Sequence, residues 1–460
     1  MPRARTLRAS ADSVLAWFSG LHVLRQDALL YLVAGVFAGL TSLVAVTDDY
    51  REWGLVAVGP YLVAALACEW VVRRRERAGI TGLEGEGRAS RFRRVVVLLL
   101  LLGVVLIPLA LQVTFRADAA GCVTNHRAAQ AQPEVSVIER AGDRVASFHD
   151  PYLAHPKTVG VSPSNDCRSV NANTFFPYLP GMVIFGVANA AHLPRELGDA
   201  RVWLAGSTIL LVLMSLLLVD STTRRRWRAF QFLVVLPTGA LPMVTGGDDL
   251  PVLALLLLGL VLAQRRRPVL AGLVMGLAGT LKWTAWPLIL LAILCVRDED
   301  DRPATLRYSL SVLLVALPVI GAGLALGAHA FVENVVLFPL GLTSVRSPAA
   351  SPLPGQVLVQ LLPHYKRVLT VCLVGGGAAV VLGFLLKHPP RSAYAAAWFA
   401  GWALAFATLI APATRFGYLI YPANMFVWAY LLHYHLAERR REEPLLEPPV
   451  SPAAQLSSPS

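Results

Sequence analysis

The stretch VVVLLLLLGVVLIPLALQV, residues 95–113, decides the fold of this chain. It is continuously apolar and close to the length of about 20 residues that a helix needs to cross a bilayer. A strand of a membrane β-barrel would instead alternate between apolar and polar residues. Because a helix satisfies its own backbone hydrogen-bonding groups within lipid, the stretch predicts an all-α membrane protein.

The composition extends this prediction to the whole chain. Of the 460 residues, 55% are apolar and only 15% are charged, and the mean hydropathy is +0.57. Soluble domains carry about a quarter charged residues. Further apolar runs predict a polytopic bundle of about twelve spans, with residues 268–296 divided into two short spans around Lys282. The other expected spans are 28–46, 54–72, 95–114, 202–220, 229–245, 250–264, 306–328, 367–386, 394–411 and 417–435.

The positive charge indicates how the bundle is oriented. The net charge is +12, and most of the 41 lysines and arginines fall in short segments that the spans place on one side. The segment 73–94 alone contains eight arginines. Basic loops favour the cytoplasmic side, so we expect a multi-pass protein of the cell membrane with both termini in the cytoplasm. This asymmetry explains the basic composition without a nucleic-acid partner.

The spans divide the chain into four parts. Residues 1–27 form a cytoplasmic N-terminus, and 28–94 hold two transmembrane helices and a basic cytoplasmic loop. Residues 95–435 form the main membrane module, whose exterior loop covers 115–201, and 436–460 form a disordered cytoplasmic tail rich in Pro, Ser and Glu. Within the exterior loop, FFPYLPGMVIFGVANAA (175–191) is short for a span. We expect it to lie in the outer interface or to re-enter from it.

The five cysteines fall into two groups. Cys68, Cys295 and Cys372 lie in apolar spans, where a thiol behaves as a small hydrophobe. Cys122 and Cys167 lie in the exterior loop, on the oxidising side, and are predicted to form a disulfide; two unpaired thiols are the alternative.

Charged residues at the outer ends of the spans are candidates for a functional site, because such groups in or beside a membrane tend to mark function. A lysine near the bilayer centre is costly, whereas the two-span division moves Lys282 to the outer boundary. Snorkelling to lipid headgroups is its alternative role. Asp248 and Asp249 begin the span 250–264, where they could bind acceptor hydroxyls or cap the helix.

Two longer motifs carry a family resemblance. The run PEVSVIERAGDRVASFHDPY (133–152), followed by FFPYLPGMVIFG (175–186), resembles the first exterior loop of the GT-C membrane glycosyltransferases. It is most similar to family 87, the polyprenol-phosphate-mannose-dependent α-mannosyltransferases of actinobacteria. That family has an acidic residue, a PY dipeptide about 18 residues later, and prolines that open a membrane-parallel helix. The stretches AGLVMGLAGTLKWTAWPLILL (271–291) and ATRFGYLIYP (413–422) also match.

The resemblance implies a GT-C fold and an inverting transfer of a sugar from a polyprenyl-phosphate donor to an exported lipid or glycan acceptor. The sugar is mannose in this family, and arabinose or another pentose is the alternative. An exterior carboxylate would act as general base. Glu134 stands where the family usually has aspartate, and Asp118 is the alternative. A polytopic transporter or lipid flippase is the rival interpretation.

The resemblance and the positions of the charged residues also suggest which side chains would contact the substrates. The donor phosphate would contact Lys282, Arg415, Arg346, Lys366 and His364, and the acceptor or sugar would contact Asp248, Asp249, Tyr152 and Tyr178. The sequence requires no metal or other cofactor.

Overall fold

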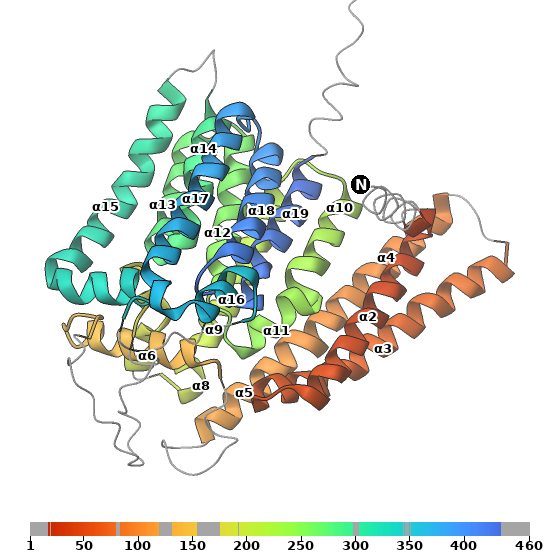
Figure 1. The fold of residues 1–460 in the computed structure, drawn as a ribbon. Helices are drawn as coiled ribbons and strands as arrows, with labels where there is room; N and C mark the ends of the chain where they lie inside the picture. The colour runs from red at the N-terminus through yellow and green to blue at the C-terminus, as the bar shows by residue number, and fades with distance from the viewer. Residues whose placement is uncertain are drawn as a thin grey trace, which may run out of the picture.

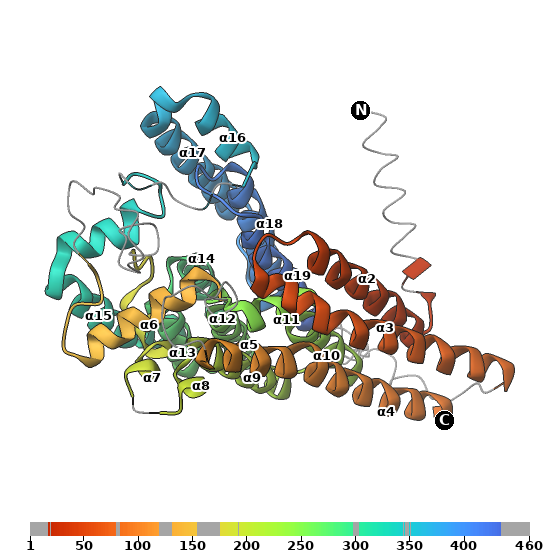
Figure 2. The ribbon, with the colours of Figure 1, turned by 90° about the horizontal axis from the view of Figure 1, so that it is seen from below.

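The computed structural model describes residues 17–18, 20–79, 83–118, 131–153, 175–191, 193–297, 303–343, 345, 349 and 351–433. These residues form helices and connecting segments and no β-strand, and the helices run together as a bundle (Figure 1; Figure 2 shows it from below). The disulfide predicted between Cys122 and Cys167 and the contact predicted for Arg346 lie outside the described residues. The side chain of Asp118 also lies outside the description.

Within the described residues, eight helical stretches are long and apolar enough to cross a membrane, and four shorter apolar helices accompany them. Each predicted span corresponds to one of these stretches, so the prediction of an all-α polytopic membrane protein is confirmed, while the number of spans stays a prediction. The eight are Val23–Val44, Asp48–Arg77, Ala89–Ala117, Ala200–Leu218, Thr223–Thr245, Pro303–Leu337, Pro363–Lys387 and Ala393–Ile410. The four are Asp249–Gln264, Pro268–Leu281, Trp283–Val296 and Phe416–Leu432.

The centre of the bundle is α12 (Asp249–Gln264), because its side chains are apolar on every face. All of its residues from Leu250 to Ala263 are buried, as expected for a helix with no polar side. Around it pack α9 (Ala200–Leu218), α13 (Pro268–Leu281), α14 (Trp286–Val296), α18 (Ala393–Ile410) and α19 (Ile420–Leu432). At the periphery, α15 (Pro303–Val332) and α17 (Lys366–Lys387) leave most of their apolar side chains exposed, which suits contact with lipid.

The N-terminal helices are joined to this bundle by specific contacts. These helices are α2 (Val23–Val44), α3 (Asp48–Arg77) and α4 (Leu83–Leu100), which continues through η1 (Leu101–Leu106) into α5 (Ile107–Asp118). Tyr61 donates to the backbone oxygen of Val235 at 2.5 Å. The buried carboxylate of Asp27 pairs with Arg93 at 2.7 Å and with Arg228 at 2.5 Å. The position of α2 is therefore fixed relative to the bundle.

Two boundaries differ from those expected. The helix of the first expected span, α2, begins at Val23 rather than at 28, and the basic segment 73–94 is largely helical rather than a loop, because α3 ends at Arg77 and α4 begins at Leu83. Arginine and glutamate are good helix formers, so a helix extends readily beyond its apolar part. Arg25 supports the extension by pairing with Glu69 and Glu76.

A layer of short elements crosses one end of the bundle. It contains α6 (Pro133–Ala146), η3 (Pro180–Phe185), α7 (Val187–Ala190) and α8 (Arg195–Gly198), and α6 lies across the vertical helices in Figure 1. Residues 175–191 pack in this layer as η3, α7 and connecting segments and contain no candidate span, whereas their place at the outer membrane interface stays a prediction. A Cβ atom at Gly142 of α6 would lie 2.1 Å from the backbone of Gly186, so only glycines allow this contact.

Candidate active site

A cavity of about 1500 Å³ begins beneath α6 and extends along the bundle. Most of its lining is apolar. Its charged lining residues lie on α6 and at four chain turns: the turn between α2 and α3, the turn between α11 (Pro237–Thr245) and α12, the break between α13 and α14, and the loop between α18 and η8 (Phe416–Leu419). The cavity therefore joins a polar end to a long apolar part.

Glu134 lies in the first turn of α6, and its position is fixed by the residue before the helix. The backbone N–H of Gln132 donates to the backbone oxygen of Thr245 at 2.9 Å, and its side chain donates to Tyr50 at 2.6 Å. Arg415 then reaches the Glu134 carboxylate, with 2.7 Å between Nη1 and Oε1. The arginine side chain is 35% exposed and the glutamate 19%, so both remain accessible from the cavity.

Lys282 stands between α13 and α14, where the backbone becomes extended (φ −153°, ψ 143°). Its ammonium group donates to Asp248 at 2.8 Å and to the carboxylate of Asp249. The lysine thus points into the bundle and does not snorkel. Asp248 occupies the N-cap position of α12, but its carboxylate makes no capping hydrogen bond and binds Lys282 instead.

A tyrosine that the sequence analysis did not assign completes this group. Tyr421 of α19 donates to Asp249 at 2.5 Å, and the hydroxyls of Tyr421 and Thr284 are 2.6 Å apart. Tyr421 belongs to the quoted run 413–422, but nothing in that run alone indicates a partner more than 170 residues away in sequence.

Gly246 allows the acidic turn to approach α6. Its φ of +108° is unfavourable for a residue with a Cβ atom. A Cβ there would also lie 2.1 Å from Val135 of α6. The end of α11 can therefore turn sharply beneath Glu134 and carry Asp248 to Lys282.

The close packing of charges changes their proton affinities. Burial raises the pKa of Asp248 to about 6, and the carboxylates of Asp249 and Glu134 add to the rise, whereas Lys282 opposes it. Burial by itself would lower the pKa of Lys282, but the two aspartates raise it well above its usual value. Burial would likewise lower the pKa of Arg415, and Glu134 raises it. Both cations are therefore charged at neutral pH.

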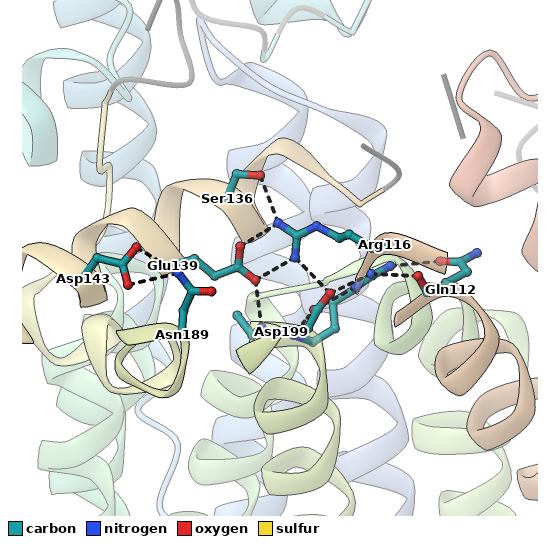
Figure 3. A network of polar contacts seen from close by, with 9 residues as sticks. Gln112, Arg116, Ser136, Glu139, Asp143, Asn189 and Asp199 are labelled. Atoms are coloured by element: carbon teal, nitrogen blue, oxygen red, sulfur yellow. Dashed lines mark hydrogen bonds and ion pairs between the residues drawn. The ribbon is translucent and has the colours of Figure 1, made fainter. Parts of the chain in front are cut away.

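A second polar network, shown in Figure 3, holds α6 in place. Arg116 of α5 pairs with Glu139 of α6 at 2.6 Å and with Asp199 at 2.9 Å. Glu139 also accepts from the backbone N–H of Ala200 at 3.0 Å. The two buried carboxylates and the half-buried Arg116 bind one another and do not line the cavity, so their role is to connect α6 with α5 and α9.

The other expected site residues lie in different surroundings. Tyr178 lines the cavity, and the Lys282 ammonium lies 5.2 Å from the centre of its ring. Tyr152 is buried, and its hydroxyl donates to the backbone oxygen of Tyr178 at 2.9 Å, so it supports the cavity wall from behind. His364 and Lys366 are exposed at the start of α17 and do not line the cavity.

The charged lining is acidic overall. Five carboxylates line the cavity among the described residues, compared with the two cations Lys282 and Arg415. Both cations already contact carboxylates. The carboxylate oxygens that do not bind these two cations can accept hydrogen bonds, which suits the hydroxyl groups of a sugar. Within the described ranges, no three His, Cys, Asp or Glu side chains come together as potential metal ligands. The five carboxylates are Asp48, Asp49, Glu134, Asp248 and Asp249.

Comparison with known proteins identifies the family. Residues 176–412 match the model of glycosyltransferase family 87, and a search of curated proteins finds no match. The matched range includes Tyr178, Asp248 and Lys282, whereas Glu134 lies well before it and Arg415 lies just after it. Because the match covers more than half of the chain, this multi-pass membrane protein belongs to glycosyltransferase family 87 and is a glycosyltransferase.

Proposed function

We propose that this glycosyltransferase transfers mannose from a polyprenyl-phosphate donor to an exported lipid or glycan acceptor, with inversion at the anomeric carbon. The observation that carries the proposal is the contact between Glu134 and Arg415 at the polar end of the cavity. It joins a carboxylate suited to general-base catalysis with a guanidinium suited to phosphate. A donor with an apolar chain also suits a cavity that is apolar along most of its lining.

In the proposed reaction, Glu134 accepts the proton of the acceptor hydroxyl. The hydroxyl oxygen then forms a bond to the anomeric carbon as the bond from that carbon to the phosphate oxygen breaks. Polyprenyl phosphate leaves with the bonding electron pair. Attack from the face opposite the leaving group converts a β-linked donor into an α-linked product.

The observed ion pair gives Arg415 a further role in this scheme. While Arg415 donates to Oε1 of Glu134, this oxygen is engaged in a hydrogen bond and is less available to the acceptor hydroxyl. A donor phosphate would offer Arg415 a second anion, and bidentate contacts to phosphate are among the strong charge-assisted hydrogen bonds. We therefore propose that donor binding draws Arg415 partly away from Glu134 and leaves the carboxylate able to accept a proton.

The side chains around Lys282 would bind the sugar that is transferred. Asp248 and Asp249 can accept hydrogen bonds from sugar hydroxyls, and Tyr178 offers an aromatic face. Lys282 would add positive charge near the phosphate as negative charge develops on it. Since Lys366 and His364 are exposed outside the cavity, the proposal assigns the phosphate to Arg415 and Lys282.

We further propose that the α6 end of the bundle faces away from the cytoplasm. In Figure 1, α2 begins and α19 ends at the opposite end. Arginine-rich turns also gather there: Arg225 donates to the backbone oxygen of Tyr430 in α19 at 2.9 Å, and Arg265 pairs with Asp220 at 3.1 Å. Basic residues concentrate on the cytoplasmic side of membrane proteins, so the polar cavity would open on the other side.

A transfer assay without a membrane gradient tests the proposed function against the transporter alternative. Purified protein in detergent is supplied with labelled polyprenyl-phosphate mannose and a lipid extract of the cell envelope. We expect the label to move to a new glycolipid with an α-linkage by NMR. Intact donor after incubation, together with donor movement across reconstituted vesicles, would contradict the proposal.

A further inference from the structure

The N-terminal helix α2 forms a wall of the same cavity, although it lies outside the residues that match the family. Its lining residues are Leu30, Val33, Ala34 and Phe37. They recur at the spacing that places side chains on one face of a helix. From Leu30 to Phe37 this wall covers about 10 Å along the helix axis. The cavity therefore continues well away from Glu134, along a membrane-spanning helix.

The remaining walls of this apolar part are also membrane-spanning helices. One of these walls is the candidate span Thr223–Thr245. Its helix is broken at Leu236, where the backbone is extended (φ −73°, ψ 162°) between η4 (Gln231–Val235) and α11. Phe232, Leu236 and Leu241 line the cavity around this break. Leu404 of α18 and Ile420 of α19 line it from the other side.

The apolar wall on α2 is accessible. Val33 is 68% exposed and Phe37 is 44% exposed, and both are on a helix long and apolar enough to cross a membrane. An accessible apolar groove inside the bilayer is filled by hydrocarbon. Because this groove is continuous with the polar end that holds Arg415, one molecule with an anionic head and a long apolar tail could occupy both parts.

We propose that the groove along α2 binds the isoprenoid chain of the donor, so that α2 determines which donor chain lengths the enzyme accepts. The inference rests on the proposed function, since it takes the donor to be a polyprenyl phosphate. It adds that the N-terminal helices belong to the substrate site. The buried pairs of Asp27 with Arg93 of α4 and with Arg228 of α10 (Thr223–Phe230) hold α2 against these two helices.

The test narrows the groove and varies the donor chain. Val33→Trp places a large side chain in the groove. Leu32→Trp is the matched control, because Leu32 is 47% exposed on the same helix but does not line the cavity. Each purified full-length variant is assayed with decaprenyl-phosphate mannose and with geranyl-phosphate mannose, whose chain is too short to extend far along α2.

We expect Val33→Trp to raise KM for the decaprenyl donor by about tenfold or more, because overpacking opposes binding of the chain. KM for the geranyl donor and kcat should match the wild type, and Leu32→Trp should leave both donors unaffected. Equal effects of the two substitutions, or an increase in KM for both donors or for the acceptor alone, would overturn the inference. A wild type that uses neither donor would instead overturn the proposed function.

Discussion

Arg415 and Lys282, the two cations that line the described part of the cavity, are held in different ways. Lys282 is paired with two carboxylates and its side chain is 15% exposed, whereas Arg415 contacts Glu134 and is 35% exposed. Removing one partner from a buried ion pair destabilises a protein by about 3–5 kcal/mol. A substitution of Lys282 would therefore affect folding, and Arg415 is the better residue for testing phosphate binding.

Replacing Arg415 with methionine should weaken donor binding. A hydrogen bond to a charged group contributes about 1.5–3 kcal/mol, so KM for the polyprenyl-phosphate donor should rise by about 10- to 100-fold. Arg415→Lys should restore part of the loss because it keeps the charge. Lys366→Met is the control, since Lys366 lies outside the cavity, and it should leave KM unchanged. A Lys366 variant impaired as strongly as the Arg415 variant would show that the phosphate binds elsewhere.

The sequence indicated several individual residues of the site, but it could not indicate which side chains they contact. Lys282 was identifiable because a lysine inside an apolar stretch is energetically unfavourable unless it has a function or a partner. Asp248 and Asp249 were identifiable because they begin a span. That the three side chains meet depends on how two turns approach each other in space. For Tyr152, the sequence motif was recognised and predicted a substrate contact, but its burial behind Tyr178 was not predicted.

Among the elements, α6 carries the site and has the most specific supports. Gln132 fixes its first residue, the pair of Arg116 with Glu139 fixes its middle, and Gly142 allows contact with Gly186. The sequence indicated this helix only through a family motif. Apolar length was a reliable guide to the long apolar helices, because a helix that crosses lipid requires it. It gave no guide to α6, whose position depends on buried polar contacts with α5 and α9.

The proposed orientation of α6 can be tested by cysteine labelling. Ser147 is exposed at the end of α6, and Arg267 is exposed at the opposite end of the bundle, between α12 and α13. In intact cells, a membrane-impermeant maleimide should label Ser147→Cys above the wild-type background. Arg267→Cys should react only after the membranes are opened. The reverse pattern would place the cavity on the cytoplasmic side and contradict the orientation.

Considered as a whole, the molecule combines a family-matched bundle with N-terminal helices that lie outside the matched range. The sequence presented α2 and α3 as additional helices before the main module, and their contribution to the cavity was not predictable from hydropathy. The contact of Tyr61 with Val235 and the pairs of Asp27 arise between segments far apart in the chain. We propose for the molecule as a whole that its cavity unites a general base with the binding site of a lipid-linked donor.

The measurement that tests this claim most directly is the single-turnover rate of Glu134→Gln, which keeps the shape of the side chain but cannot accept the proton. General-base catalysis contributes about 10²- to 10⁴-fold, so the rate should fall by that factor while donor KM changes little. Asp143→Asn is the control, because Asp143 accepts from Asn189 at 2.8 Å and does not line the cavity. Asp118→Asn tests the alternative base. Wild-type turnover by Glu134→Gln, or a loss confined to Asp118→Asn, would contradict the claim.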